Sequence, residues 1–171
     1  IVQITSPFYR PYYYEKNPNL TSDVRANELA LLNDVLKIEG VDVVRLRKVE
    51  CFDISSIVGK FATGSLVVFV DGERSPSLYR RFRVRQNEGP NDTAMMSEII
   101  KRRFNHREWE FPDLVIVDGG KGQVSAALRI LAKMHINIPV IGLAKRLETI
   151  ISGAFKAPFI TPNLKEVRLE K

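Results

Sequence analysis

Two aspartates in this chain stand where they can hold a metal ion. Asp118 follows the apolar run 114–117 and opens a glycine-rich turn that carries Lys121. Asp53 lies in a second strand-like run, 49–55. Charged residues are seldom left at the rim of a core without a partner or a function. Two strand-borne carboxylates suggest a divalent metal ion, and a metal ion beside a lysine suggests phosphate chemistry.

Two-metal hydrolysis of a phosphodiester needs carboxylates that bridge two ions about 4 Å apart. One ion generates a hydroxide nucleophile and the other stabilises the leaving oxygen. Asp53 and Asp118 suit this role, with Mg²⁺ or Mn²⁺, if the fold brings them together. Taken singly, each aspartate is explained more simply as a capping residue at the end of a strand. Both interpretations remain open at this point.

The turn 119–123, with the sequence Gly-Gly-Lys-Gly-Gln, can bring backbone N–H groups close to a phosphate at the start of a helix. It lacks the Gly-x-x-x-x-Gly-Lys-Ser/Thr pattern of a P-loop. A tight strand-to-helix turn explains the glycines equally well. Lys121, between two glycines, is harder to explain by packing.

A predicted strand at 78–84 carries several arginines. Phe82 lies on one face by the period of two, whereas Arg81 and Arg83 share the other face. Such a row neutralises phosphates without reading base sequence, and the basic cluster 101–103 can do the same. Positive charge that protects a solvated edge strand from aggregation is the alternative. The residues expected to contact a phosphate backbone are Lys121, Arg80, Arg81, Arg83 and Lys145.

Composition limits the remaining possibilities. The 171 residues, 44% of them hydrophobic, fit one globular domain with an appended segment. An excess of 26 Lys+Arg over 20 Asp+Glu gives a net charge of +6, which favours polyanions, although a soluble basic protein of any function has the same balance. No apolar run reaches the roughly 20 residues of a membrane span. We therefore expect a cytoplasmic location and no membrane contact.

The chain has one cysteine and two histidines. Cys51 excludes an internal disulfide, and we expect it to be buried and unreactive, as is compatible with a reducing compartment. His106 and His135 are expected at the surface rather than as metal ligands. Because the chain lacks an initiating Met and a stop signal, we expect it to be part of a longer protein.

Hydrophobic periodicity and turn residues predict a mixed α/β fold. A helix at 21–39 that ends at Gly40 precedes the order β-β-β-α-β-α-β, and a weaker hairpin signal follows residue 145. The elements of that order are expected at 49–55, 64–70, 78–84, 92–104, 114–117, 123–134 and 140–144. This is the order of ribonuclease H-like folds, with a five-stranded sheet flanked by helices. It predicts that the strands of Asp53 and Asp118 lie side by side at the sheet centre.

Several segments resemble the C-terminal half of the UvrC family, the excinuclease subunits of bacterial nucleotide excision repair. The resemblance runs from about residue 45 to 150, in order and with compatible spacing. The segments that carry it are 50–55, 79–82, 89–92, 112–123 and 138–145.

The resemblance implies an RNase H-like endonuclease that cuts DNA 5′ to a lesion with Mg²⁺ or Mn²⁺. Asp53 and Asp118 match the two family aspartates. The family histidine belongs to a downstream helix that this chain does not reach, and neither His106 nor His135 occupies its position. Ser56 stands where the family usually has His, and the segment after residue 145 matches only loosely.

We therefore predict a metal-dependent endodeoxyribonuclease domain of the UvrC type, which acts on damaged duplex DNA. A UvrB-like partner would bind through regions outside this chain. Residues 1–44 are expected to be a lead-in segment and helix. Residues 45–171 are expected to form an RNase H-like domain that is truncated at its C-terminus. The truncation leaves open whether this chain is active by itself. One alternative is a UvrC-like module that binds DNA or a repair partner without cleaving. A small-nucleotide enzyme that uses the glycine turn is the other.

Overall fold

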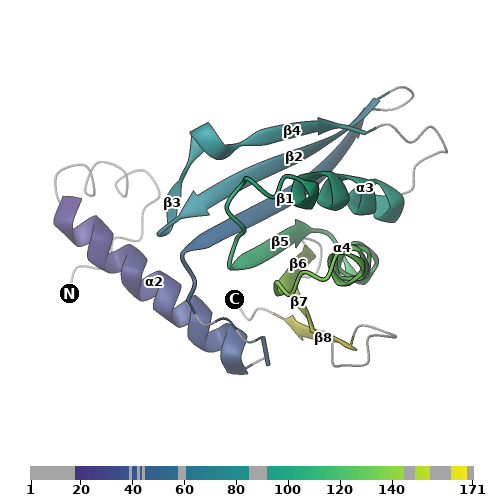
Figure 1. Ribbon diagram of the computed structural model, residues 1–171. Coiled ribbons are helices and arrows are strands. Elements are labelled where there is room, and N and C mark those ends of the chain that lie inside the picture. Colours follow the sequence, from purple (N-terminus) through teal and green to yellow (C-terminus); the bar gives the residue numbers. More distant parts are fainter. Residues whose placement is uncertain are drawn as a thin grey trace.

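The computed structural model describes twelve helical and extended elements (Figure 1). The described residues are 18–38, 40–41, 43, 45–57, 61–84, 92–144, 149–154 and 163–168. The elements are α2 (Pro18–Ile38), β1 (Lys48–Ile57), β2 (Phe61–Val70), β3 (Glu73–Arg74), the 3₁₀ turn η1 (Pro76–Leu78), β4 (Arg80–Arg83), α3 (Asp92–Asn105), β5 (Leu114–Asp118), α4 (Lys121–Lys133), β6 (Val140–Ala144), β7 (Thr149–Ala154) and β8 (Asn163–Arg168).

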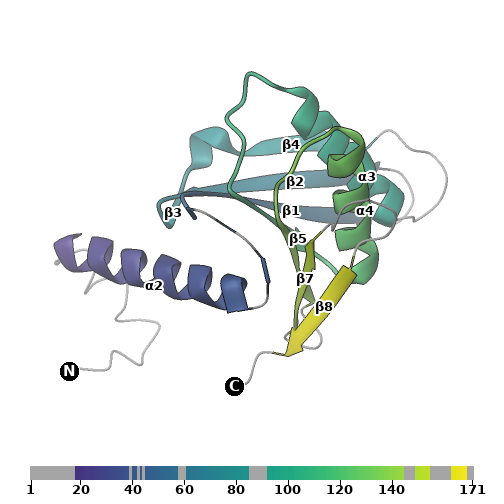
Figure 2. The ribbon, with the colours of Figure 1, turned by 60° about the horizontal axis from the view of Figure 1, so that its bottom comes forward.

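The strands form one mixed sheet in the order β3-β2-β1-β5-β6-β7-β8, and β4 also pairs with β2. β1, β5 and β6 run parallel to one another, and the other pairs are antiparallel. The predicted mixed class and element order are confirmed. The sheet has eight strands rather than five, because β3, β7 and β8 join the predicted set. β7 corresponds to the weak hairpin signal after residue 145 and pairs with β6. β8 lies beside β7 at the end of the sheet (Figure 2).

The predicted hairpin after β2 is present, but its second strand differs from the predicted one. Asp71 and Gly72 both adopt positive φ, 51° and 77°, which the tight turns of hairpins require. The return strand predicted at 78–84 is shorter, Arg80–Arg83, because the 3₁₀ turn η1 that begins at Pro76 includes Leu78 and separates β4 from the additional strand β3. β4 then pairs with β2 again, with Phe82 opposite Gly64.

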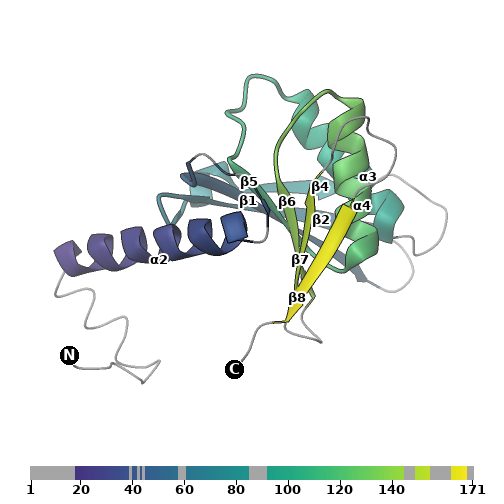
Figure 3. The same ribbon diagram turned by 90° about the horizontal axis from the view of Figure 1, so that it is seen from below.

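Helices cover the two faces of the sheet unequally (Figures 1 and 3). α3 and α4 pack on one face over a large core that includes Phe52, Val117 and Ile99. α2 packs on the other face over a smaller core around Leu36 and Leu114. We call these the α3 face and the α2 face. No helix in the described ranges combines the length and apolar character that crossing a membrane requires.

α2 ends at Ile38, and Gly40 shortly after it is the stop that the sequence predicts. Gly40 has φ 76°, and its N–H donates to the carbonyl of Lys37 at 2.9 Å. The N–H of Val41 donates to the carbonyl of Leu36 at 2.8 Å, which completes a Schellman motif. Val41 and Leu36 also join the small core, so the end of the helix and its attachment to the sheet depend on the same residues. The domain boundary at residue 45 stays a prediction.

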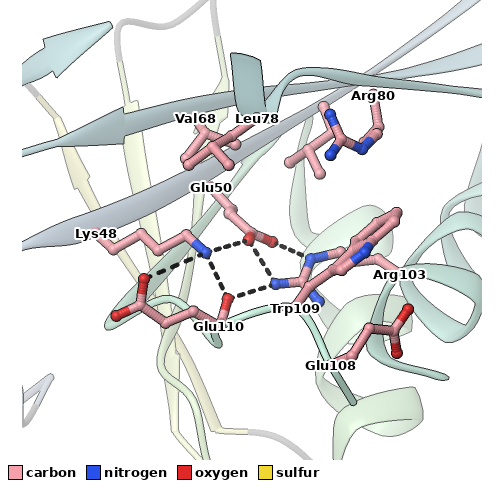
Figure 4. Close-up of a pocket in the computed structure, with 10 residues that line it drawn as sticks. Lys48, Glu50, Val68, Leu78, Arg80, Arg103, Glu108, Trp109 and Glu110 are labelled. Carbon is pink, nitrogen blue, oxygen red and sulfur yellow. Dashed lines mark hydrogen bonds and ion pairs between the residues drawn. The ribbon is translucent and has the colours of Figure 1, made fainter. Parts of the chain in front are cut away.

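A buried ion cluster connects α3 to the start of β1 (Figure 4). Arg103 donates to both carboxylate oxygens of Glu50, at 2.8 and 2.6 Å, and to the carbonyl of Glu110. Lys48 lies 3.5 Å from the same carboxylate. Glu50 and Arg103 are each 1% exposed, so Arg103 cannot contact phosphate as a member of the basic cluster 101–103. The pair orients α3 on the sheet.

Removing one partner of this pair should be costly. We expect Glu50→Leu to lower the free energy of unfolding by about 3–5 kcal/mol, because it leaves Arg103 buried without its counter-charge. Urea unfolding followed by circular dichroism measures the change. Glu50→Leu combined with Arg103→Met should recover most of the loss.

Glu73→Ala is the matched control, because it removes the exposed ion pair of Glu73 with Arg25. It should cost at most about 1 kcal/mol. A cost for Glu50→Leu no larger than that of the control would contradict a stabilising role for the buried pair.

Candidate active site

The parallel pairing of β1 and β5 brings the two predicted aspartates together. Its register runs from Val49 opposite Leu114 to Phe52 opposite Val117. Asp53 and Asp118 are the next residue on each strand. Because neighbouring strands lie roughly 4.8 Å apart and side chains alternate between faces, both carboxylates emerge side by side on the α2 face. The predicted adjacency of these strands is confirmed.

The register is anchored at the opposite ends of the same strands by Asp113. Its carboxylate accepts hydrogen bonds from the backbone N–H of Arg47 at 2.8 Å and of Lys48 at 2.7 Å. Its own N–H donates to the carbonyl of Lys48 at 2.8 Å. A slip of one residue would break all three bonds and send one aspartate to the other face. The sequence did not predict that Asp113 fixes the register, because an aspartate before a strand is also typical of an ordinary turn.

The aspartates lie beyond the area that α2 covers. Cys51 and Ile116, two residues earlier on each strand, pack against the small core under α2. Asp53 is exposed and Asp118 is half-buried. Burial, with a smaller contribution from the charge of Glu50, raises the pKa of the Cys51 thiol to about 11. That thiol stays protonated at neutral pH and does not serve as a nucleophile.

The sheet continues the row of side chains in both directions from the aspartates. Asp53 lies opposite Ser65, and Ser65 lies opposite Arg81. On the other side Asp118 lies opposite Leu143. We call the set Arg81, Ser65, Asp53, Asp118 and Leu143 the site row. Two strand spacings put the Arg81 backbone roughly 10 Å from Asp53, within reach of a neighbouring phosphate.

The predicted phosphate contacts divide between the two faces. Arg83, opposite Thr63, shares the face of Arg81, and both are exposed. Arg80 lies opposite the buried Leu66 and so points to the α3 face. There it donates to the carbonyls of Ser77 and Tyr79 and lies 5.0 Å from the ring centroid of Trp109.

Of the two predicted lysines, Lys121 and Lys145, the structure describes only Lys121. Lys121 is exposed at the first position of α4, three residues after Asp118. The helix therefore begins at Lys121 rather than at the predicted Gln123. Lys145 lies outside the described residues.

Close packing against strand β6 confines the turn after Asp118. A Cβ on Gly142 would lie 2.7 Å from the carbonyl oxygen of Gly119 and 2.5 Å from Val124 Cγ2. The N–H of Gly119 donates to the Leu143 carbonyl at 3.2 Å, and that of Gly120 donates to Gln123 Oε1 at 3.1 Å. Strand β6 thus holds the turn in place. Sequence reasoning missed Gln123, although a Gln at the third helical position is a capping signal.

The donor set fits a hard divalent cation. Mg²⁺ is commonly bound by one or two carboxylates together with water and phosphate oxygens. Asp53 and Asp118 supply two carboxylates on one face. The described ranges hold no group of three or more His, Cys, Asp or Glu side chains arranged to bind a metal. The remaining ligands would therefore come from solvent, from substrate or from residues outside those ranges.

The histidines lie away from the carboxylates. His106 follows α3, stacks on Trp109 with ring centroids 4.1 Å apart and hydrogen-bonds Glu108. His135 follows the C-terminus of α4, whereas Asp118 precedes its N-terminus. A helix of 13 residues separates the two by about 20 Å.

A cavity of about 230 Å³ lies on the α3 face, beside the buried ion cluster (Figure 4). Glu50 and Arg103 in its wall are already paired with each other, and the Trp109 ring contacts Arg80, Arg103 and His106. The glycine turn does not line this cavity. The cavity therefore does not support a small-nucleotide enzyme that uses the glycine turn. The site row is the stronger candidate for a functional site.

Comparison with known proteins matches the chain to one family. The family model described as the UvrC RNAse H endonuclease domain matches residues 27–171. The chain is 42% identical over 130 residues to UvrABC system protein C of Methanothermobacter thermautotrophicus, covering 76% of this chain and 22% of that protein. It is 36% identical over 156 residues to the protein of the same name from Methanosarcina acetivorans, covering 86% and 30%. The chain thus spans less than a third of these relatives.

Among solved structures, the chain is similar to Ciona intestinalis endonuclease V in complex with a 24mer DNA. The TM-score is 0.45 at 13% identity, over 71% of this chain and 59% of that one. The likeness is too distant to assign a function.

The packing of the turn can be tested at Gly142. We expect Gly142→Ala to lower the free energy of unfolding by about 1–3 kcal/mol, because its Cβ must displace the Gly119 carbonyl or Val124. Urea unfolding measures this. Gly120→Ser is the matched control, since nothing lies within 4 Å of a Cβ there and Ser suits the start of a helix. Equal costs for the two variants would show that β6 does not confine the turn.

Proposed function

This chain belongs to the UvrC RNase H endonuclease domain family, and from that premise we propose that it cleaves phosphodiester bonds of damaged duplex DNA. The observation that carries the proposal is the register of β1 and β5, which ends at Phe52 opposite Val117 and puts Asp53 and Asp118 side by side. The finer proposal is an incision 5′ to a lesion in nucleotide excision repair. It rests on the family resemblance.

Asp53 and Asp118 would hold Mg²⁺ or Mn²⁺. When bound, such an ion activates water towards a phosphodiester and stabilises the charge that develops. The two carboxylates fix where the ion and the scissile phosphate meet. Arg81 and Arg83, on the same face, neutralise neighbouring phosphates. Lys121 approaches the same end of β5 from the helix start.

The names of the relatives suggest further partners. Those proteins are called UvrABC system protein C, so we propose that the parent protein works with a UvrB-like partner through regions outside this chain. Damaged duplex DNA is the proposed substrate and the cytoplasm the proposed location.

A binding module that does not cleave is the second candidate. It is favoured by the carboxylate count, because the described residues supply two carboxylates to the site and no third acidic or histidine ligand. Such a module would still bind DNA through Arg81 and Arg83. Metal binding and cleavage therefore need separate measurements.

Manganese binding tests the metal site. The wild-type chain should bind Mn²⁺ in a calorimetric titration, and Asp53→Asn combined with Asp118→Asn should abolish that binding because both carboxylate charges are lost. Asp71→Asn, in the exposed hairpin turn where Asn tolerates positive φ, is the control and should bind as wild type. Unchanged binding by the double variant would refute the nuclease proposal. Binding that is lost on mutation, with no wild-type cleavage of a lesion-bearing duplex in MnCl₂, would favour the binding module.

The DNA-contacting face can be identified from salt dependence. Arg81→Gln combined with Arg83→Gln should reduce the slope of log K against log salt by about 1–2, because each lost phosphate contact contributes roughly 0.9. Fluorescence anisotropy with a 30-base-pair duplex measures this. Arg80→Gln is the matched control, since Arg80 points to the α3 face. An equal effect of Arg80→Gln would mean that DNA does not lie across the α2 face.

A further inference from the structure

Leu143 is an exposed leucine in the site row. It is 39% exposed, whereas Ile141, two residues earlier on the same strand and face, is 2% exposed beneath α2. Single exposed leucines are common on proteins and need no explanation. This one lies directly opposite Asp118, one strand spacing of roughly 4.8 Å away. It therefore lies beside any phosphodiester bound at the two carboxylates.

The backbone of Leu143 is also tied to the turn. Its carbonyl accepts the N–H of Gly119 at 3.2 Å, so the position of Leu143 is fixed relative to Asp118. The same packing that makes Gly142 necessary holds this part of β6. Leu143 is thus a fixed apolar surface at the site.

The site row changes chemical character from one end to the other. Arg81 provides a cation on β4, Ser65 a hydroxyl on β2, and Leu143 an apolar surface on β6. A phosphate placed against Leu143 would lose water without gaining a donor, which costs free energy. A nucleobase placed there gains from the removal of apolar surface from water.

We infer that Leu143 contacts the base of the nucleotide next to the phosphodiester held at Asp53 and Asp118. This inference rests on the proposed function. Arg81 and Arg83 take the phosphates on the opposite side of the carboxylates, so the nucleic-acid strand crosses the sheet from β4 to β6. Leu143 is then a positioning residue that determines which way the strand lies.

The test compares two oligonucleotides with one sugar–phosphate backbone. One is an ordinary single-stranded 20mer, and the other carries abasic tetrahydrofuran units at every position. Anisotropy is read in MnCl₂ at 4 °C, with intact length checked on a gel. Leu143→Ser should weaken binding of the ordinary strand about three- to tenfold, leave binding of the abasic strand unchanged and leave the salt slope unchanged, because apolar contact alone is lost.

Two control variants accompany the Leu143→Ser measurement. Leu143→Met keeps the apolar surface and should bind both strands as wild type does. Leu31→Ser removes an exposed leucine from α2, 65% exposed and away from the site row, and should also change nothing.

An equal loss for both strands, or no loss for either, would overturn the inference. A clear fall in the urea midpoint of Leu143→Ser with unchanged affinity would mean that protein covers Leu143, and would also overturn the inference. The Mn²⁺ titration of wild type and of the double aspartate variant separates this failure from failure of the proposed function. Intact metal binding with no base dependence rejects only the role of Leu143.

Discussion

The parallel pairing of β1 with β5 is the constraint on which the site depends. These strands are far apart in sequence, so their pairing depends on contacts between distant segments of the chain. Their register is set by bonds at the start, where Asp113 binds the backbone of Arg47 and Lys48. The consequence appears at the far end, where two carboxylates emerge on one face. Like charges on neighbouring strands destabilise a sheet, a cost that is typical of a functional site.

The two faces of the sheet handle charge in opposite ways. On the α3 face, Glu50 and Arg103 are buried and satisfy each other with two hydrogen bonds. On the α2 face, Asp53, Asp118 and Arg81 lie at the surface of the sheet, exposed or half-buried. The buried pair on one face stabilises the packing of α3, whereas the charges on the other face are accessible to solvent. The ion pair that supports the fold and the charges that we propose for function thus lie on opposite faces.

Sequence reasoning predicted the parts that depend on local pattern. Alternation and turn chemistry located the central strands and the hairpin at Asp71, whereas the neighbouring positions of Asp53 and Asp118 followed from the order of the elements. Alternation also puts Arg80 on the face of Phe82 rather than on that of Arg81, although both arginines were expected on DNA. Which helix covers which face is a tertiary property, and it decided that Arg103 is buried while Arg81 is exposed. The partners of β7 and the packing of Gly142 against Gly119 likewise depend on contacts that no local pattern encodes.

The central position of β1 and β5 has a consequence for motion. Each is hydrogen-bonded on both sides, with β2, β3 and β4 beyond one and β6, β7 and β8 beyond the other. Sheets open first at their edges and termini, while central strands open with free energies close to that of global unfolding. The amide hydrogens of the two aspartate-bearing strands should be among the last to exchange. The paired backbone up to Phe52 and Val117, directly before the two carboxylates, should therefore stay closed while the edges of the sheet open.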